Sequence, residues 1–297
     1  MFDRIDQGMY WDKAWTLVSG CIRCSPGCEY CWALVMENRF SREPKVTIFD
    51  KKVEKFLGQR VFGKIRIHSE RLNIPLKRKK PTVWAIWNDL FHEDVPEEPF
   101  IREAFWAMSQ AGWHTFLLLT KRAKRMFEWA QGNPWPENIW LGADGDTQQE
   151  ADEKIPILRQ IPAAVRFISV EPLLEQTDLC LSPGIEISAP YGIHGIHWVI
   201  AGGETGPGAR PMHPDWARSV RDQCQAAGVP FLFKQFGEWG KEGKQTPAPT
   251  KLKISNFKRI PRHAAFPDGT TLWHCGKKAA GRLLDGREYN ELPEVKG

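Results

Sequence analysis

Short apolar runs rich in β-branched and aromatic residues recur along the chain. They are AWTLV (14–18), TVWAIW (82–87), HTFLLL (114–119), NIWLG (138–142), VRFISV (165–170), HWVIA (197–201) and VPFLF (229–233). Near-continuous apolarity is typical of strands that are covered on both faces. The pattern therefore predicts a sheet buried between two layers.

Helical periodicity appears between these runs. The apolar positions are Ile101, Phe105, Met108 and Ala111 in one stretch, and Trp216, Val220 and Cys224 in another. Steps of three and four residues are typical of an amphipathic helix. Gly112 and Gly228 follow the last periodic residues and predict the helix ends.

Strands that alternate with helices predict an α/β fold with a parallel sheet. Six or seven such units are fewer than the eight of a closed barrel, so a partial (β/α) barrel is expected over residues 1–240, with a doubly wound sheet as the alternative. Residues 42–81 are charged and weakly periodic, and we expect them to be an insertion in the first crossover. Turn-forming residues follow Gly237, so 241–297 are expected to form a C-terminal extension packed on the barrel.

Composition narrows the class without changing the fold expected. The 297 residues are 42% hydrophobic and 26% charged, as in ordinary globular proteins. No apolar run reaches the roughly 18 residues of a membrane helix. The first residues do not lead from a basic segment into an apolar one, so a cytoplasmic location is expected and no membrane partner.

Positive charge is concentrated in three segments. The net charge is +5, and basic residues gather in 71–80, 121–125 and 251–262. Such segments are either solvated faces or phosphate-binding surfaces. The 14 tryptophans are open to two interpretations as well, since an indole can stack on a base or fill the core.

Four of the seven cysteines lie within eleven residues, in GCIRCSPGCEYCWA. These are Cys21, Cys24, Cys28 and Cys31. The odd total and the tight spacing favour metal or redox chemistry over a disulfide framework. The spacing fits neither a paired-knuckle zinc site nor the bacterial ferredoxin run well. The other three cysteines have no partner at ligand spacing, and we expect Cys224 and Cys180 to be buried.

Polar residues end several of the predicted strands. Parallel sheets bind ligands at the carboxyl ends of their strands, so these positions are candidates for binding. They are Asn88, Asp89, Thr120, Lys121, Glu171, Gly203, Glu204, Lys234 and Gln235, with His92, Arg210 and His213 in loops on the same rim.

The spacing Cys24-x3-Cys28-x2-Cys31, placed after the first strand, resembles that of radical S-adenosylmethionine (SAM) enzymes. The resemblance implies a partial barrel in which three thiolates hold a [4Fe-4S] cluster and leave one iron open for SAM. It further implies that Asp89 binds the SAM ammonium group. Lys121 would contact SAM carboxylate, SAM ribose or a substrate phosphate.

The same resemblance gives roles to three more residues at the rim. It implies that Glu171 and Glu204 bind ribose or support other ligand contacts. Gly203 would permit close approach of the backbone to the cofactor.

A closer resemblance, over nearly the whole chain, is to the phage and prophage three-cysteine-motif proteins. The similar stretches are GCIRCSPGCEYCWA (20–33), DLFHEDVP (89–96), HTFLLLTKR (114–122), WLG (140–142), SVEPLL (169–174), GGETGPGARPMHPDWARSVRDQC (202–224), PFLFKQFG (230–237) and AAGRLLDGREY (279–289). That family's cysteines fall at Cys21, Cys28 and Cys31, and the position of Cys24 is commonly aliphatic. The third cluster ligand is therefore either Cys21 or Cys24.

These resemblances predict a radical SAM enzyme that requires an external electron donor. The basic segments, with a shorter similarity to spore photoproduct lyase-like proteins, favour a nucleic acid as substrate. One alternative is a non-catalytic iron-sulfur or zinc protein that binds nucleic acid. The other is a radical SAM enzyme that acts on a small molecule or a protein, for which a phage-encoded partner is a candidate.

Overall fold

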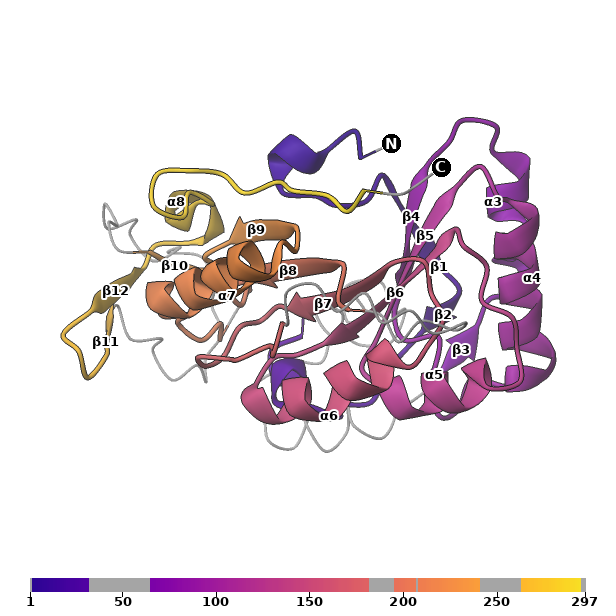
Figure 1. Ribbon diagram of the computed structural model, residues 1–297, viewed down its shortest axis with the longest axis horizontal. Coiled ribbons are helices and arrows are strands. Elements are labelled where there is room, and N and C mark those ends of the chain that lie inside the picture. Colours follow the sequence, from indigo (N-terminus) through magenta and orange to yellow (C-terminus); the bar gives the residue numbers. More distant parts are fainter. Residues whose placement is uncertain (1, 32–64, 182–194, 207, 241–262, 295–297) are drawn as a thin grey trace, which may run out of the picture.

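The computed structural model describes residues 2–31, 65–181, 195–206, 208–240 and 263–294. Seven parallel strands form its main sheet (Figure 1). They are β1 (Lys13–Thr16), β4 (Val83–Trp87), β5 (Thr115–Thr120), β6 (Ile139–Asp144), β7 (Arg166–Val170), β8 (Trp198–Gly202) and β9 (Phe231–Gln235). Every apolar run of the sequence contributes a strand, within one or two residues of the predicted bounds.

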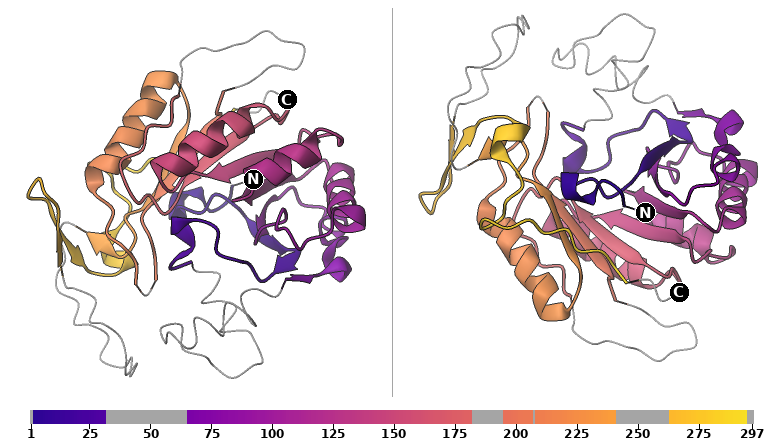
Figure 2. Two further views of the ribbon diagram at one scale, coloured as in Figure 1. Left: turned by 90° about the horizontal axis from the view of Figure 1, so that it is seen from below. Right: turned by 90° about the horizontal axis from the view of Figure 1, so that it is seen from above.

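The strands follow one another across the sheet in chain order, from β1 to β9. Neighbours pair in parallel, as in the alignment of Phe116 with Ile139. The sheet curls into a half-barrel (Figure 2). The α/β fold is thus confirmed, and the half-barrel is compatible with the expected partial (β/α) barrel.

Helices cover the convex face of the half-barrel (Figure 1). They are α3 (Ile74–Lys77), η4 (Glu97–Ile101), α4 (Arg102–Gln110), α5 (Ala123–Ala130), α6 (Gln148–Arg159) and α7 (Pro214–Ala227). The larger core lies here, with fully buried Phe116, Met126 and Val220 among its members. Cys224 belongs to this core as predicted, but Cys180 is exposed, because it lies after β7 in a segment that is neither helix nor strand.

The concave face is covered by the chain's own N-terminal segment and its last described residues. A short 3-10 turn, η1 (Ile5–Gln7), lies in the N-terminal segment. Tyr10, Trp140, Trp198 and Leu232 form a second buried cluster on this side of the sheet. The alternation of side chains along each strand thus supplies two cores, one on each face.

The last described residues run along the outer edge of β9. Phe233 N donates to Tyr289 O at 3.0 Å, and Glu291 N donates to Phe231 O at 3.2 Å. The indole Nε1 of Trp198 donates to Glu291 O at 2.9 Å. We call residues 287–292 the C-terminal tail.

Two small sheets complete the described fold. The first pairs β2 (Val18–Ser19) with β3 (Arg66–Ile67), which is followed by η3 (Ser69–Arg71). The second contains β10 (Trp239–Gly240), β12 (Thr271–His274) and β11 (His263–Ala265), in this order. The short helix α8 (Lys277–Ala280) lies next to it. The predicted insertion lies partly outside the described residues, and the basic segment 251–262 lies wholly outside them. β10 lies within residues 1–240, the expected barrel, yet it pairs with β12 of the expected C-terminal extension. The division of the chain into these two units stays a prediction. Across the described part of the chain, no helix has both the length and the apolarity to cross a membrane.

Candidate metal centre

The four clustered cysteines lie on residues 20–31, directly after β2, which we call the cysteine loop. A short 3-10 turn, η2 (Pro26–Cys28), shapes its middle. Ser25 precedes the turn in an extended conformation, and Cys28 N donates to Ser25 O at 3.0 Å. Proline at the first helical position suits such a start, because its fixed φ matches a helix.

Two arginines hold the cysteine loop from opposite parts of the rim. Arg122, after β5, donates from Nη2 to Ile22 O at 3.4 Å. Arg210, after β8, donates to Pro26 O at 3.0 Å and to the Glu29 carboxylate at 3.1 Å. The loop is therefore fixed over the carboxyl ends of the strands.

A third anchor comes from β6 and the residues that follow it. Ser25 Oγ donates to Asp146 Oδ2 at 3.2 Å. A Cβ on Gly27 would lie only 1.8 Å from the same oxygen. Glycine is required at position 27 because the loop backbone rests directly on this carboxylate.

The far end of the loop packs against residues after β8. A Cβ on Gly208, where φ is +86°, would lie 2.5 Å from the Tyr30 ring. The Arg210 guanidinium lies 5.4 Å from the centre of that ring. Tyr30 therefore packs within the site, as a residue of the loop.

The loop thiols differ in acidity. The pKa of Cys28 falls to about 4, first because the Cys24 thiol donates a hydrogen bond to its sulfur, and also because Lys121 and the Ser25 hydroxyl act on it. The same hydrogen bond raises the pKa of Cys24. Burial, followed by the charge of Asp89, raises the pKa of Cys21 to about 12. The lowered pKa of Cys28 favours its thiolate, the form that binds metals.

Zinc and an iron-sulfur cluster require different spacings of their thiolate ligands. In the part of the chain that the structure describes, no three of their sulfur atoms lie within 4.8 Å of one another. A single tetrahedral zinc, with bonds of about 2.3 Å, requires sulfurs about 3.8 Å apart. In an iron-sulfur cluster each thiolate binds a different iron, so the sulfurs lie farther apart. Thiolates of a cluster would therefore not need the close approach that ligands of one zinc ion require.

Asp89 lies at the carboxyl end of β4, close to the cysteine loop, and is already well supplied with hydrogen bonds. Its carboxylate accepts from Thr120 Oγ1 at 2.6 Å, Lys121 N at 3.1 Å and Arg122 Nη1 at 2.9 Å. Phe91 N adds a fourth donor at 3.0 Å. A ligand's ammonium group would share this carboxylate with four protein groups.

Lys121 points into a pair of buried carboxylates. Its Nζ lies 2.6 Å from Asp144 and 2.6 Å from Asp146, and Lys154 binds Asp144 at 2.7 Å. Burial raises the pKa of Asp146, the charge of Lys121 lowers it, and the charge of Asp144 raises it. The result is a pKa of about 7. Burial lowers the pKa of Lys121, but the two carboxylates outweigh it and the net shift is upward. The ammonium group is therefore charged and held in place.

Sequence reasoning missed Asp144 and Asp146, although both follow the predicted strand at 138–142. The rule that selected Asp89 and Lys121, a polar residue at the carboxyl end of a buried strand, applies to them equally. The sequence shows neither that both carboxylates are buried nor that Asp146 lies beneath the cysteine loop.

Glu171 forms a separate polar group at the ends of β7 and β9. Its carboxylate accepts from Lys234 Nζ at 2.9 Å and from Gln235 Nε2 at 3.1 Å. The ammonium group also lies 5.5 Å from the Tyr10 ring and 5.3 Å from the Trp11 ring. This group ties the N-terminal segment to the rim.

Gly203 and Glu204 lie where β8 ends. A Cβ on Gly203 would lie 2.1 Å from Phe236 O, so close backbone packing within the protein already requires this glycine. Glu204 is buried and pairs with Arg210 at 2.6 Å. Through Arg210 it supports the cysteine loop.

The basic run 121–125 faces inward rather than toward solvent. Lys121 binds carboxylates, and Arg122 binds Asp89 at 2.9 Å. Arg125 donates to the main-chain oxygens of the loop after β4. Only Lys124 is exposed in this run. The run therefore builds the rim, a role that neither interpretation of its charge anticipated.

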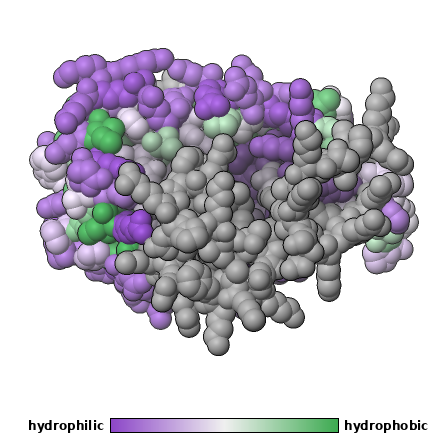
Figure 3. Space-filling view, turned by 180° about the vertical axis from the view of Figure 1, so that it is seen from behind, coloured by the Kyte–Doolittle hydropathy of each residue, from purple (hydrophilic) through white to green (hydrophobic). Residues whose placement is uncertain are grey.

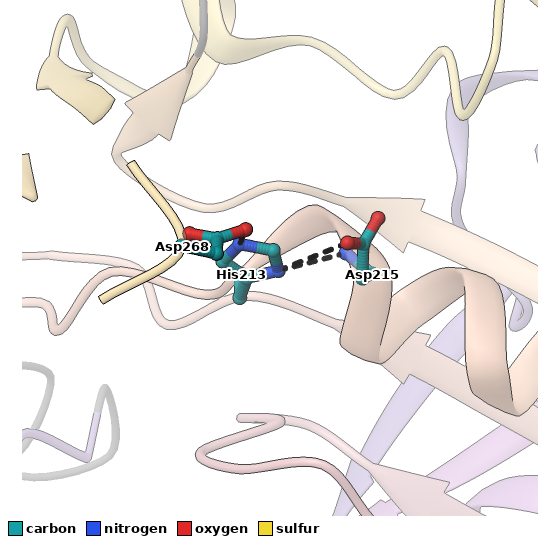
Figure 4. Close-up of side chains that lie close together, drawn as sticks. All are labelled: His213, Asp215 and Asp268. Atoms are coloured by element: carbon teal, nitrogen blue, oxygen red, sulfur yellow. Dashed lines mark hydrogen bonds and ion pairs between the residues drawn. The ribbon is translucent and has the colours of Figure 1, made fainter. Parts of the chain in front are cut away.

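His213, Asp215 and Asp268 come together at the start of α7 (Figure 4). The imidazole Nδ1 accepts from Asp215 N at 3.1 Å, so the ring proton lies on Nε2, which donates to Asp268 at 3.1 Å. Both ring nitrogens are thus used within the protein. The group caps α7 and links it to the turn between β11 and β12.

The described surface seen in Figure 3 is largely hydrophilic, and its hydrophobic side chains are scattered. Trp106 is 57% exposed and Trp113 40% exposed. Trp113 Nε1 donates to Arg78 O at 2.9 Å, which places this indole against the basic segment 71–80.

The chain matches the model of the DUF5131 family, described as a protein of unknown function, over residues 7–293. It therefore belongs to this family. No curated protein and no solved structure matches it.

Proposed function

We propose that this protein is a radical SAM enzyme whose cysteine loop holds a [4Fe-4S] cluster. The observation that carries the proposal is the position of the loop: four thiols lie over the carboxyl rim of a half-barrel, held by Arg122, Asp146 and Arg210. Ligands bind at this end of parallel sheets. When bound, the cluster supplies one-electron reduction of SAM, which yields a 5'-deoxyadenosyl radical.

Three of the four irons would take a thiolate from the protein, and the fourth would stay open for SAM. Cys28 and Cys31 are common to both resemblances, and the third ligand is Cys21 or Cys24. We favour Cys21, because the resemblance to the three-cysteine-motif proteins extends over nearly the whole chain and has a cysteine at this position, whereas the position of Cys24 is commonly aliphatic there.

For SAM we propose the rim residues Asp89, Lys121, Glu171, Gly203 and Glu204. All five lie at or just after the strands' carboxyl ends. Two of the five lie close enough to the loop thiols to act on them electrostatically, Asp89 on Cys21 and Lys121 on Cys28. The ion pairs described above keep these side chains oriented before a ligand arrives, which reduces the cost of binding.

For the substrate we propose a nucleic acid. The basic run 121–125 faces inward, so it does not support this part of the proposal. Support now comes from the segment 71–80, where Lys77 and Lys79 are exposed, and from Trp113 beside it. Lysines bind phosphates and indoles stack on bases. An external electron donor is required to reduce the cluster.

The test is anaerobic reconstitution followed by electron paramagnetic resonance of the reduced protein, with and without SAM. We expect a [4Fe-4S] signal that changes on addition of SAM, with 5'-deoxyadenosine formed. Cys21→Ala and Cys24→Ala identify the third ligand, and Cys180→Ala is the matched control, because Cys180 is exposed and lies outside the loop. A cluster that does not respond to SAM would instead support the non-catalytic iron-sulfur protein.

A further inference from the structure

Asp146 connects the sheet to the part of the cysteine loop that carries Cys28. We propose that Asp146 is a positioning residue, which holds the turn from Ser25 to Cys28 and, with Lys121, sets the charge that faces the thiols. The inference rests on the metal centre proposed above.

The first argument is a continuous set of contacts. Lys121 Nζ lies 2.6 Å from Asp146 Oδ2, and Ser25 Oγ donates to the same oxygen at 3.2 Å. Ser25 Oγ in turn lies 3.5 Å from Cys28 Sγ. Asp146 is fully buried, so solvent does not compete for these contacts.

The second argument is steric. A Cβ on Gly27 would lie 1.8 Å from Asp146 Oδ2, so the carboxylate fits directly under the loop backbone. An Asp146 side chain cut back to alanine leaves the turn without this support. The other oxygen, Oδ1, is buried without a hydrogen-bond partner among the described residues, so the side chain is held through Oδ2 alone.

The third argument is charge. The Lys121 ammonium lies between Asp144 and Asp146, and it acts electrostatically on Cys28. Asp146→Asn removes the negative charge that the ionised Asp146 carries, so this region becomes more positive. Reduction adds an electron to a cluster, so more positive surroundings raise its midpoint potential.

The experiment compares Asp146→Ala and Asp146→Asn with the wild type, and uses Asp152→Asn as the matched control. Asp152 is an exposed carboxylate on α6 whose partner is Gln148. Three quantities are measured: the rate of iron removal by a chelator, the midpoint potential of the cluster, and hydrogen exchange of the peptide 20–31 in the metal-free protein. Circular dichroism verifies that each variant is folded.

We expect Asp146→Ala to lose iron about tenfold faster than the wild type, with faster exchange in the loop, as is common for groups that orient metal ligands. Asp146→Asn retains the Ser25 hydrogen bond, so its iron loss stays near that of the wild type while its midpoint potential rises. The control matches the wild type in all three measurements.

The inference is overturned if Asp146→Ala matches Asp152→Asn in iron loss and loop exchange. A wild type that binds no cluster refutes the proposed function and the electrostatic part of the inference, but loop exchange still decides the positioning part. If Asp146→Ala does not fold, Ser25→Ala tests the same contact from the loop, and Ser25→Thr, which keeps the hydroxyl, should restore wild-type iron retention.

Discussion

Arg122 and Asp89 form a buried ion pair at the rim, with Nη1 and Oδ2 2.9 Å apart and both side chains less than 10% exposed. Arg122 also donates a hydrogen bond from Nη2 to the carbonyl oxygen of Ile22 in the cysteine loop. One side chain thus joins the end of β4 to the candidate metal centre.

Removal of Arg122 should destabilise the protein strongly. Arg122→Met leaves Asp89 buried without its cation, and we expect a loss of about 3–5 kcal/mol in the free energy of unfolding. Urea denaturation measures it. The control is Glu93→Gln, since Glu93 also pairs with Arg122 but is 63% exposed, and it should cost less than about 1 kcal/mol. Equal losses for the two variants would contradict the buried pair.

Gly142 in β6 should not tolerate a methyl group. A Cβ there would lie 2.3 Å from the Phe167 ring, inside the concave-face core. We expect Gly142→Ala to cost about 1–3 kcal/mol of unfolding free energy, as overpacking does. Gly132→Ala is the control, because a Cβ at Gly132 meets nothing within 4 Å. Thermal unfolding distinguishes them, and a stable Gly142→Ala would show that the two strands are not packed as described.

Asp285 should make stability depend on pH in the acid range. Hydrogen bonds from Arg218 and then Arg221 lower its pKa from 3.8 to about 2. A lowered folded-state pKa stabilises the protein above the unfolded value, and this contribution disappears as pH falls from about 4 to 2. Asp285→Asn should therefore be less stable than the wild type at pH 6, with the difference lost by pH 2. Unfolding across this range checks it, and a pH-independent difference would refute it.

Trp113 and the lysines near it should contribute to nucleic-acid binding. Trp113→Ala removes a stacking surface, which is worth about 1–3 kcal/mol per base, so affinity for single-stranded DNA or RNA should fall at least about fivefold. Lys77→Ala should reduce the salt dependence by about one unit of slope. Leu283→Ala, at another exposed hydrophobic residue, is the control for fluorescence-anisotropy titrations. Affinity unchanged by Trp113→Ala would remove the support from this surface.

The strands could be predicted because each is covered on both faces. In β5, Phe116 lies in the core beneath the helices and Leu117 in the core of the concave face, so neighbouring positions are all apolar. Chain order across the sheet follows from the alternation of strands and helices. The strands of the half-barrel and their order could therefore be predicted from the sequence.

The partners of the charged residues could not be predicted in the same way. Lys121 was selected correctly as a rim residue, but its partners Asp144 and Asp146 come from the following strand and its loop. A run of basic residues gives charge, and only the fold decides which side of the sheet that charge faces. The positions of Asp89 and Glu171 at strand ends were predictable for the same reason as the strands, whereas their ion pairs were not.

The C-terminal tail covers the outer edge of β9. β9 is the last strand of the sheet, and the tail occupies backbone groups on its outer edge through Tyr289 and Glu291. An uncovered edge strand is a template for strands of other molecules. Deletion of residues 287–292 should therefore produce aggregation through β9, so any shortened form of this protein needs to keep the tail.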